Sequence, residues 1–268
     1  MMFFEKSEFV NKFISIMEEC NKIIMDVYDS DFKVVHKDDT SPLTIADEKC
    51  NAHICDHLQR INEVLINDKT IAEDSIVIIS EEIKNVGYDE RRHKEWCWLV
   101  DPLDGTKEFV KRNGQFTVNI GLIHHGVPVF GFVSIPTSND IYWGIKNVGS
   151  FKNSNNTIQP LCVIQNKDFE KKNVKIIASA SHLNQETQDY IKSFDSPIIK
   201  NTGSSIKLLW IAENKADVYP RIAPTSEWDT CAAHAIVKYA GGNVLQYDTR
   251  EELMYNKENL LNPYFIVY

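Results

Sequence analysis

The feature that most constrains this chain is an apolar strand that runs directly into two aspartates. The segment reads Trp98-Leu99-Val100-Asp101-Pro102-Leu103-Asp104-Gly105-Thr106. Pro102 fixes the backbone just after the first acid, and Gly105 permits a sharp bend or a close approach of a ligand to the backbone. Hard cations such as Mg2+ bind carboxylate oxygens, so an aspartate at a strand end and another a turn later can hold two adjacent metals. A solvated Asp-rich turn is the alternative interpretation of this segment alone.

Three further acidic segments gain meaning only in combination with this one. Glu81 and Glu82 follow a second short apolar strand, and since side chains alternate along a strand, only one of them is expected to face a site. A plain strand end also explains this pair. Asp229 lies in the first turn of a predicted helix, where an acid commonly acts as a cap. Asp47 fits a capping box with Thr44.

Apolar periodicity predicts helices packed on a mostly antiparallel sheet in the first half of the chain. Spacings of three or four residues predict helices over 9–27 and from Thr44 onward. Strict alternation over 116–122 predicts a half-buried strand, and further strands are expected at 127–135 and 141–145.

A polar, turn-forming cluster at 153–157 marks a candidate junction. Beyond it, short apolar runs alternate with helical patterns, including a helix over 226–239, which predicts α/β layering. We therefore expect an α+β domain over 1–152, an α/β domain over 153–268, and the active site between them. Other expected strands lie at 77–79, 98–100, 174–178, 198–200, 216–219, 243–247 and 264–268.

Composition limits the classes of partner. The chain has 29 Lys and Arg against 38 Asp and Glu, a formal net charge of −9, which argues against nonspecific nucleic-acid binding. Six scattered cysteines without a CxxC pair indicate reduced thiols. The sequence has neither the apolar region of a signal peptide nor a membrane-spanning run. We expect a cytoplasmic protein without a transmembrane segment; a homodimer and peripheral association with the inner membrane stay open.

In combination, these acids resemble those of the lithium-sensitive, magnesium-dependent phosphatase superfamily. It includes inositol monophosphatases, fructose-1,6-bisphosphatases and 3'(2'),5'-bisphosphate nucleotidases. The resemblance rests on Glu81 after a strand, on the segment Asp101–Thr106, and on Trp228-Asp229 much later. Bacterial CysQ-type bisphosphate nucleotidases are the most similar, because inositol monophosphatases more typically have Thr-Asn-Phe in place of Lys107-Glu108-Phe109. The segments Ser41–Asp47, Gly203–Lys207 and Leu261–Pro263 point the same way.

The resemblance implies a fold and a metal centre. The fold is a layered αβαβα sandwich of the inositol monophosphatase type, in the α+β / α/β class. Glu81, Asp101 and the backbone carbonyl of Leu103 would hold one Mg2+. Asp101, Asp104 and Asp229 would hold a second, and Glu81 would reach a third through water. Lithium would inhibit.

The resemblance also implies catalytic and substrate-binding residues. Thr106, oriented together with Asp47, would activate the attacking water, and the backbone amides of Gly105 and Thr106 would receive the phosphate. The implied reaction removes the 3'-phosphate of adenosine 3',5'-bisphosphate, giving AMP, with 3'-phosphoadenylyl sulfate as a further candidate substrate. The implied substrate-binding set is Glu81, Leu103, Asp104, Gly105, Thr106, Ser179, His182, Gly203, Ser204, Lys207 and Asp229. Helix capping is the alternative interpretation of His182 and of Gly203-Ser204.

The sequence has several alternative interpretations. An inositol monophosphatase is the first alternative and a non-catalytic metal-binding protein is a remote one. A haloacid-dehalogenase-type phosphatase has Asp-x-Asp-Gly-Thr, whereas this chain has Asp-x-x-Asp-Gly-Thr. The sequence contains no G-x-S-x-G motif, which would have indicated acyl transfer. Cys50, His53 and His57 lie at helical spacings, but the sequence offers no matching second pair and does not favour a structural zinc site.

Overall fold

The computed structural model describes residues 2–31, 34–36, 42–83, 86–164, 169–170, 172–178 and 184–268. Its helices are η1 (Phe3–Glu5), α1 (Ser7–Tyr28), α2 (Ile45–Asn67), α3 (Tyr88–Arg91), α4 (Thr106–Val110), α5 (Gln185–Lys192), α6 (Ile206–Ala212) and α7 (Glu227–Tyr239). Within these described ranges, no helix is both long and apolar enough to cross a membrane.

A seven-stranded sheet forms the centre of the fold, in the order β3-β4-β5-β6-β7-β8-β9. Only β3 and β4 pair in parallel, and every later neighbour is antiparallel, which confirms the expected mostly antiparallel sheet. Its strands are β3 (Ile76–Ser80), β4 (Trp96–Asp104), β5 (Thr117–His124), β6 (Val127–Ile135), β7 (Asp140–Ile145), β8 (Gly149–Ser154) and β9 (Thr157–Leu161).

The polar cluster at 153–157 lies in the turn of the β8–β9 hairpin. Ser154 pairs with Thr157, and β9 continues the same sheet to Leu161. The two Asn residues between them, Asn155 and Asn156, have φ of 51° and 60°, which suits a tight hairpin turn. The division into two domains at residue 152 stays a prediction.

The second half of the chain adds smaller sheets and helices. Strands β10 (Lys175–Ala178) and β11 (Ile198–Asn201) pair in parallel, and β12 (Tyr219–Arg221), β14 (Phe265–Val267) and β13 (Val244–Gln246) form an antiparallel sheet. The short strands β1 (Val34–His36) and β2 (Pro42–Thr44) pair with each other.

The strand expected at 216–219 begins later than predicted. The turn that ends α6 continues to Ala216, whose amide donates to the carbonyl of Trp210 at 3.2 Å. Val218 makes only an isolated bridge to Ile176. Regular pairing therefore starts at Tyr219, opposite Val267.

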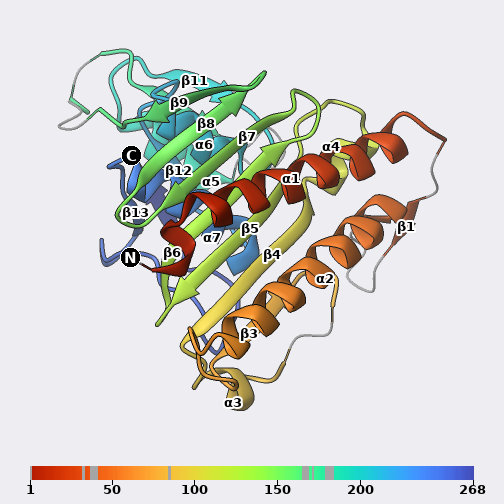
Figure 1. Ribbon diagram of the computed structural model, residues 1–268. Coiled ribbons are helices and arrows are strands. Elements are labelled where there is room, and N and C mark those ends of the chain that lie inside the picture. Colours follow the sequence, from red (N-terminus) through yellow and green to blue (C-terminus); the bar gives the residue numbers. More distant parts are fainter. Residues whose placement is uncertain are drawn as a thin grey trace.

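The prediction of a half-buried strand over 116–122 was wrong, because β5 is buried on both faces. Figure 1 shows α1 and α2 side by side on one face of the large sheet, with α7 on the other. Val118, Ile120 and Leu122 pack into the core beneath α1 and α2. The polar Thr117 and Asn119 point the other way and are buried too.

Three glycines let α7 lie directly on the sheet. Gly121, Gly131 and Gly144 pair in one row across β5, β6 and β7. A Cβ added at Gly131 would lie 2.2 Å from the carbonyl oxygen of Ala232 in α7, and one at Gly144 would lie 2.5 Å from that of Ala235. The backbone of α7 lies directly against these glycines. This contact fixes the distance of α7 from the sheet and its direction across the strands.

We expect Gly131→Ala to destabilise the protein by about 1–3 kcal/mol, the usual cost of overpacking a core. The added methyl group would push α7 outward, and with it Asp229 in its first turn, so the Mg2+ affinity expected from the sequence should fall as well. Urea unfolding and calorimetry measure the two effects. Gly87→Ala is the matched control, because no atom lies within 4 Å of its added Cβ. Equal stability of the two variants would contradict the close packing of α7.

Candidate active site

An irregularity at the end of β4 turns both aspartates to the same side of the sheet. Asp101 pairs with Asn119 and Asp104 pairs with Thr117, with a shift of register between them. Three steps along β4 therefore match two along β5. Residues 117 and 119 face the same side of β5, and paired residues point the same way, so the bulge brings Asp101 and Asp104 onto one face.

Two other acids join this pair from distant segments. Glu81 follows β3, where its amide donates to the carbonyl of Val100 at 3.2 Å. Asp229 lies in the first turn of α7, the helix that packs on the glycine row. Carboxylate oxygens of Glu81, Asp101 and Asp229 all lie within 4.8 Å of one another. The structure thus brings three of the four predicted metal acids together, and the fourth, Asp104, lines the same hollow.

The electrostatics of this cluster favour a bound cation. Burial raises the pKa of Asp101 well above its ordinary value, and the charges of Glu81, Asp104 and Asp229 raise it further. Burial raises the pKa of Asp104 to about 6, and burial together with Asp104 raises that of Asp229 to about 8. Carboxylates that are buried together repel one another unless a cation is present. An all-oxygen donor set of this kind fits Mg2+.

Asp47 caps α2, as the sequence predicted, and also contacts Thr106. Its Oδ2 accepts hydrogen bonds from the amide and hydroxyl of Thr44, at 2.8 and 2.7 Å, which completes the capping box of α2. Its Oδ1 accepts a hydrogen bond from the hydroxyl of Thr106 at 3.3 Å. The same hydroxyl lies 3.2 Å from the carbonyl of Leu103, so Thr106 and Asp47 meet beside the predicted metal ligands.

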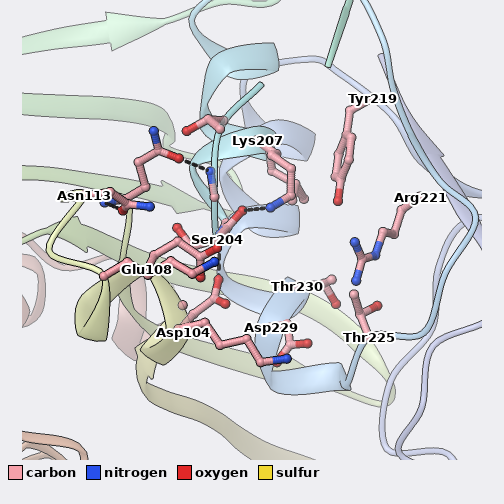
Figure 2. Close-up of a pocket in the computed structure, with 18 of the residues that line it drawn as sticks. Asp104, Glu108, Asn113, Ser204, Lys207, Tyr219, Arg221, Thr225, Asp229 and Thr230 are labelled. Atoms are coloured by element: carbon pink, nitrogen blue, oxygen red, sulfur yellow. Dashed lines mark hydrogen bonds between the residues drawn. The ribbon is translucent and has the colours of Figure 1, made fainter. Parts of the chain in front are cut away.

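The acids open into two adjoining hollows. The smaller, about 210 Å³, is lined by Glu81, Asp101, Leu103, Asp104, Gly105, Thr106, Lys107, Glu108 and Asp229. The larger, about 360 Å³, shares Asp104, Gly105, Lys107, Glu108 and Asp229 with it. Figure 2 shows how the larger pocket extends from Asp104 and Asp229 to Lys207, Tyr219 and Arg221. One small molecule can therefore contact both the acids and the basic side chains.

The basic side chains of the larger pocket are held by backbone carbonyls. Nζ of Lys207 donates to the carbonyl of Ser204 at 2.6 Å, and Arg221 donates to that of Pro224 at 2.8 Å. Burial lowers the pKa of Lys207 to about 8, although nearby Asp104 opposes this shift. Nε of Arg221 is buried without a hydrogen-bond partner in the described structure. Both groups have donors to offer a ligand.

Gly203 lies just before α6, which begins at Ile206, and packs against the loop after α4. The amide of Gly203 donates to the side chain of Gln115 at 2.8 Å, and a Cβ at this position would lie 2.8 Å from the carbonyl oxygen of Gln115. The next residue, Ser204, lines the pocket with a φ of 46°.

Some site residues carry no signal that sequence reasoning could use. The amide of Ser205 donates to Asp104 at 2.6 Å, while its hydroxyl contacts Thr117 and Asn119 at 2.8 and 2.7 Å. A backbone donor leaves no mark in a sequence, although Ser205 adjoins the recognised Gly203-Ser204 pair. Other lining residues that were not predicted are Lys107, Glu108, Asn113, Gln115, Tyr219 and Thr225. Ser179 and His182 lie outside the described residues.

Most of the chain matches known proteins. The family model described as the inositol monophosphatase family matches residues 5–264. The chain belongs to the inositol monophosphatase family. Membership accounts for the layered fold, and the expectation of an inositol monophosphatase-type sandwich is confirmed.

Within the family, several similar proteins carry the name CysQ. The 3'(2'),5'-bisphosphate nucleotidase CysQ of Shigella flexneri is 39% identical over 91% of this chain and 93% of its own length. That of Escherichia coli K12 is 37% identical with the same coverage. The crystal structure of CysQ from Bacteroides thetaiotaomicron has a TM-score of 0.77 and 39% identity, and the match covers 94% of this chain and 93% of that one. The resemblance to CysQ-type proteins is therefore confirmed.

The raised pKa values predict how stability depends on pH without metal. Asp104 and Asp229 bind protons more tightly in the folded state, so they stabilise the fold below about pH 4, and this contribution is lost as pH rises through about 6 and 8. In a chelator, we expect the melting temperature to fall by several degrees between about pH 5 and pH 9. Mg2+ should remove most of this fall.

Asp101→Asn should flatten this pH dependence, because it removes one charge from the cluster. Differential scanning fluorimetry across the pH series measures it, with the exposed Asp248→Asn as the matched control. If the chelated wild-type protein and Asp101→Asn gave the same slope, repulsion from Asp101 would add nothing to the effect of burial on these pKa values.

Proposed function

We propose that this protein is a magnesium-dependent phosphatase that removes the 3'-phosphate of adenosine 3',5'-bisphosphate, giving AMP and phosphate. The observation that carries the proposal is a partly buried cluster of acids from which Asp229, together with Asp104, reaches the pocket that Lys207 and Arg221 line. The relatives named 3'(2'),5'-bisphosphate nucleotidase support the choice of substrate. By the same resemblance, the proposal extends to 3'-phosphoadenylyl sulfate and to inhibition by lithium.

The acids divide into two proposed cation sites. Glu81, Asp101 and the carbonyl of Leu103 would hold one Mg2+, and Asp101, Asp104 and Asp229 would hold the other. When bound, such cations neutralise the charge of a phosphate dianion and lower the pKa of a nearby water. Asp101 would belong to both sites, which agrees with the closeness of its carboxylate to those of Glu81 and Asp229.

Thr106 and Asp47 would activate the attacking water. The Thr106 hydroxyl donates its hydrogen to Asp47 at 3.3 Å, so its oxygen can accept a hydrogen bond from a water in the adjoining cavity. A proton leaving that water would pass to Thr106 Oγ1 while the hydroxyl proton moves to Asp47. The hydrogen bonds from Thr44 hold Asp47 in the orientation that this transfer needs.

Backbone amides would orient the phosphate that is cleaved. Gly105 has a φ of 93° and precedes the first residue of α4, so the chain reverses there and the amides of Gly105 and Thr106 can turn toward the cavity. A side chain at Gly105 would lie 3.0 Å from the carbonyl oxygen of Gln115, which is a reason for glycine at this turn. Amides at such a turn donate to phosphate oxygens without adding charge.

Lys207 and Arg221 would bind the second phosphate of the substrate. Both line the same pocket as Asp104 and Asp229, and the only other basic residues lining it in the described structure, Lys107 and Lys111, lie in or just after α4. A bisphosphate would thus place one phosphate at the acids with their cations and the other at the basic end. A charge-assisted contact of this kind contributes about 1.5–3 kcal/mol.

A phosphate-release assay tests this function. With Mg2+, the wild-type enzyme should prefer adenosine 3',5'-bisphosphate to inositol 1-phosphate and should lose activity in chelator. Lys207→Met should lower kcat/KM for the bisphosphate about ten- to a hundred-fold and barely change hydrolysis of a small monophosphate. Lys192→Met, on the exposed part of α5, is the matched control. A wild-type preference for inositol 1-phosphate would overturn the nucleotidase assignment, and equal losses on both substrates would show that Lys207 supports the fold.

Thr106→Ala should lower kcat by roughly a hundred-fold or more, the usual scale for losing assistance by a general base. Mg2+ affinity, measured by calorimetry, should change little, because the side chain of Thr106 is not among the proposed ligands. Thr106→Ser keeps the hydroxyl and should retain most of the activity. A collapse of Mg2+ binding in the alanine variant would instead make Thr106 part of the metal site.

A further inference from the structure

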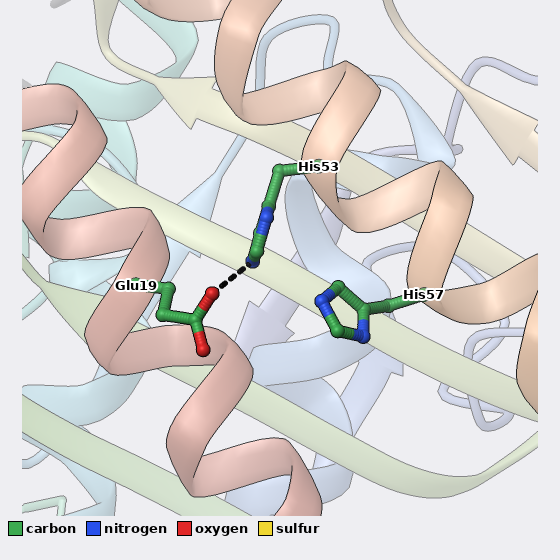
Figure 3. Close-up of side chains that lie close together, drawn as sticks. All are labelled: Glu19, His53 and His57. Atoms are coloured by element: carbon green, nitrogen blue, oxygen red, sulfur yellow. Dashed lines mark ion pairs between the residues drawn. The ribbon is translucent and has the colours of Figure 1, made fainter.

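A second group of metal-binding side chains lies between α1 and α2, apart from the acids. His53 and His57 are one helical turn apart on α2, and Glu19 faces them from α1 (Figure 3). One ligand atom from each residue lies within 4.8 Å of the other two. A carboxylate and two imidazoles from two helices therefore converge on one point.

We propose that Glu19, His53 and His57 bind a divalent transition-metal ion of the zinc class, as a clamp between α1 and α2. Two histidines at positions i and i+4 of a helix present their nitrogens on one side and recur in zinc sites. Two imidazoles and one carboxylate suit Zn2+, with a fourth position left to water. Mg2+ prefers oxygen ligands, so this site selects a different ion from the acid cluster.

The state of His53 supports the proposal most directly. Its side chain is only 17% exposed, and its Nε2 lies 3.5 Å from Oε2 of Glu19. This nitrogen is nonetheless buried without a hydrogen bond, an arrangement that costs free energy unless some group occupies the space beside it. Burial, and next to it the neighbouring His57, lower the pKa of His53. Its imidazole is therefore neutral at pH 7, the form that binds metals.

The other two ligands have the freedom to close on an ion. The rings of His53 and His57 are 4.6 Å apart, and the Glu19 side chain is 56% exposed. Around a tetrahedral zinc, the ligand atoms lie about 3.4 Å from one another. On this proposal, rotation of the exposed Glu19 carboxylate and of His57 would draw the ligand atoms, now within 4.8 Å of one another, to that spacing.

This ligand set differs from the one that the sequence suggested. Cys50 is fully buried on the core side of α2 and is not in the group, whereas Glu19 comes from another helix. His53 and His57 are six and ten residues beyond Asp47, or about 9 and 15 Å along the helix axis. The clamp is therefore separate from the proposed catalytic metals, and an ion bound there would stabilise the packing of α1 on α2.

Zn2+ and Co2+ binding in excess Mg2+ tests the clamp, because Mg2+ then occupies the acid cluster. The wild-type protein should show a rise of several degrees in melting temperature with Zn2+. Co2+ should give the intense visible absorption of a tetrahedral site that contains nitrogen ligands. His57→Gln and Glu19→Gln should each weaken Zn2+ binding at least tenfold in calorimetry and abolish the Co2+ band.

Two controls separate this site from others. Glu18→Gln changes the exposed neighbour of Glu19 and should leave the binding intact. His125→Gln changes the group of Glu95, His124 and His125, the other cluster with two histidines in the described structure, and should also leave it intact. Circular dichroism confirms that each variant is folded. Equal Zn2+ binding by the wild-type protein and both clamp variants, or loss of the Co2+ band in His125→Gln, would overturn the proposal.

Discussion

The close contact between α7 and the glycine row determines where the acid cluster can form. Gly131 and its neighbours leave no room for a side chain, so the backbone of α7 sets its own distance from β5, β6 and β7. The first turn of the helix then brings Asp229 to the edge where β4 ends. Glu81 and Asp101 reach the same point from two adjacent strands. A shift of α7 would separate one acid from the others before it affected any local structure.

The cluster that results is unfavourable by itself. The bulge in β4 aims Asp101 and Asp104 to one side, and burial together with repulsion raises the pKa values of the acids. The surrounding contacts offset part of this cost: the amide of Ser205 donates to Asp104, and that of Ser226 donates to Asp229. Cations would offset the rest. The fold thus holds together acids whose repulsion only positive charge can offset. A phosphate dianion beside these acids would need the same positive charge.

The sequence predicted the parts of this site that side-chain type and spacing specify. The acids of β4 and the Thr44–Asp47 capping box follow from local patterns, and the helices and most strands follow from periodicity. Three features depend on tertiary packing and could not be predicted this way. Thr117 and Asn119 alternate with apolar residues, as in a strand with one face in solvent. Both are nevertheless buried, and both form hydrogen bonds with the hydroxyl of Ser205. The amide of Ser205 has no signature in the sequence. Glu19 joins His53 only because α1 packs on α2.

If the proposed function is correct, the charges at the two ends of the larger pocket determine how a phosphorylated substrate binds. Asp104 at one end is charged at neutral pH and repels a phosphate until cations neutralise it, whereas Lys207 and Arg221 at the other end attract a phosphate at once. A bisphosphate would therefore bind with one phosphate at the acids and their cations and the other at the basic end. Lys207 is protonated at neutral pH, because burial lowers its pKa only to about 8. On this proposal the metals would govern turnover, and the basic end would favour substrates that carry a second phosphate.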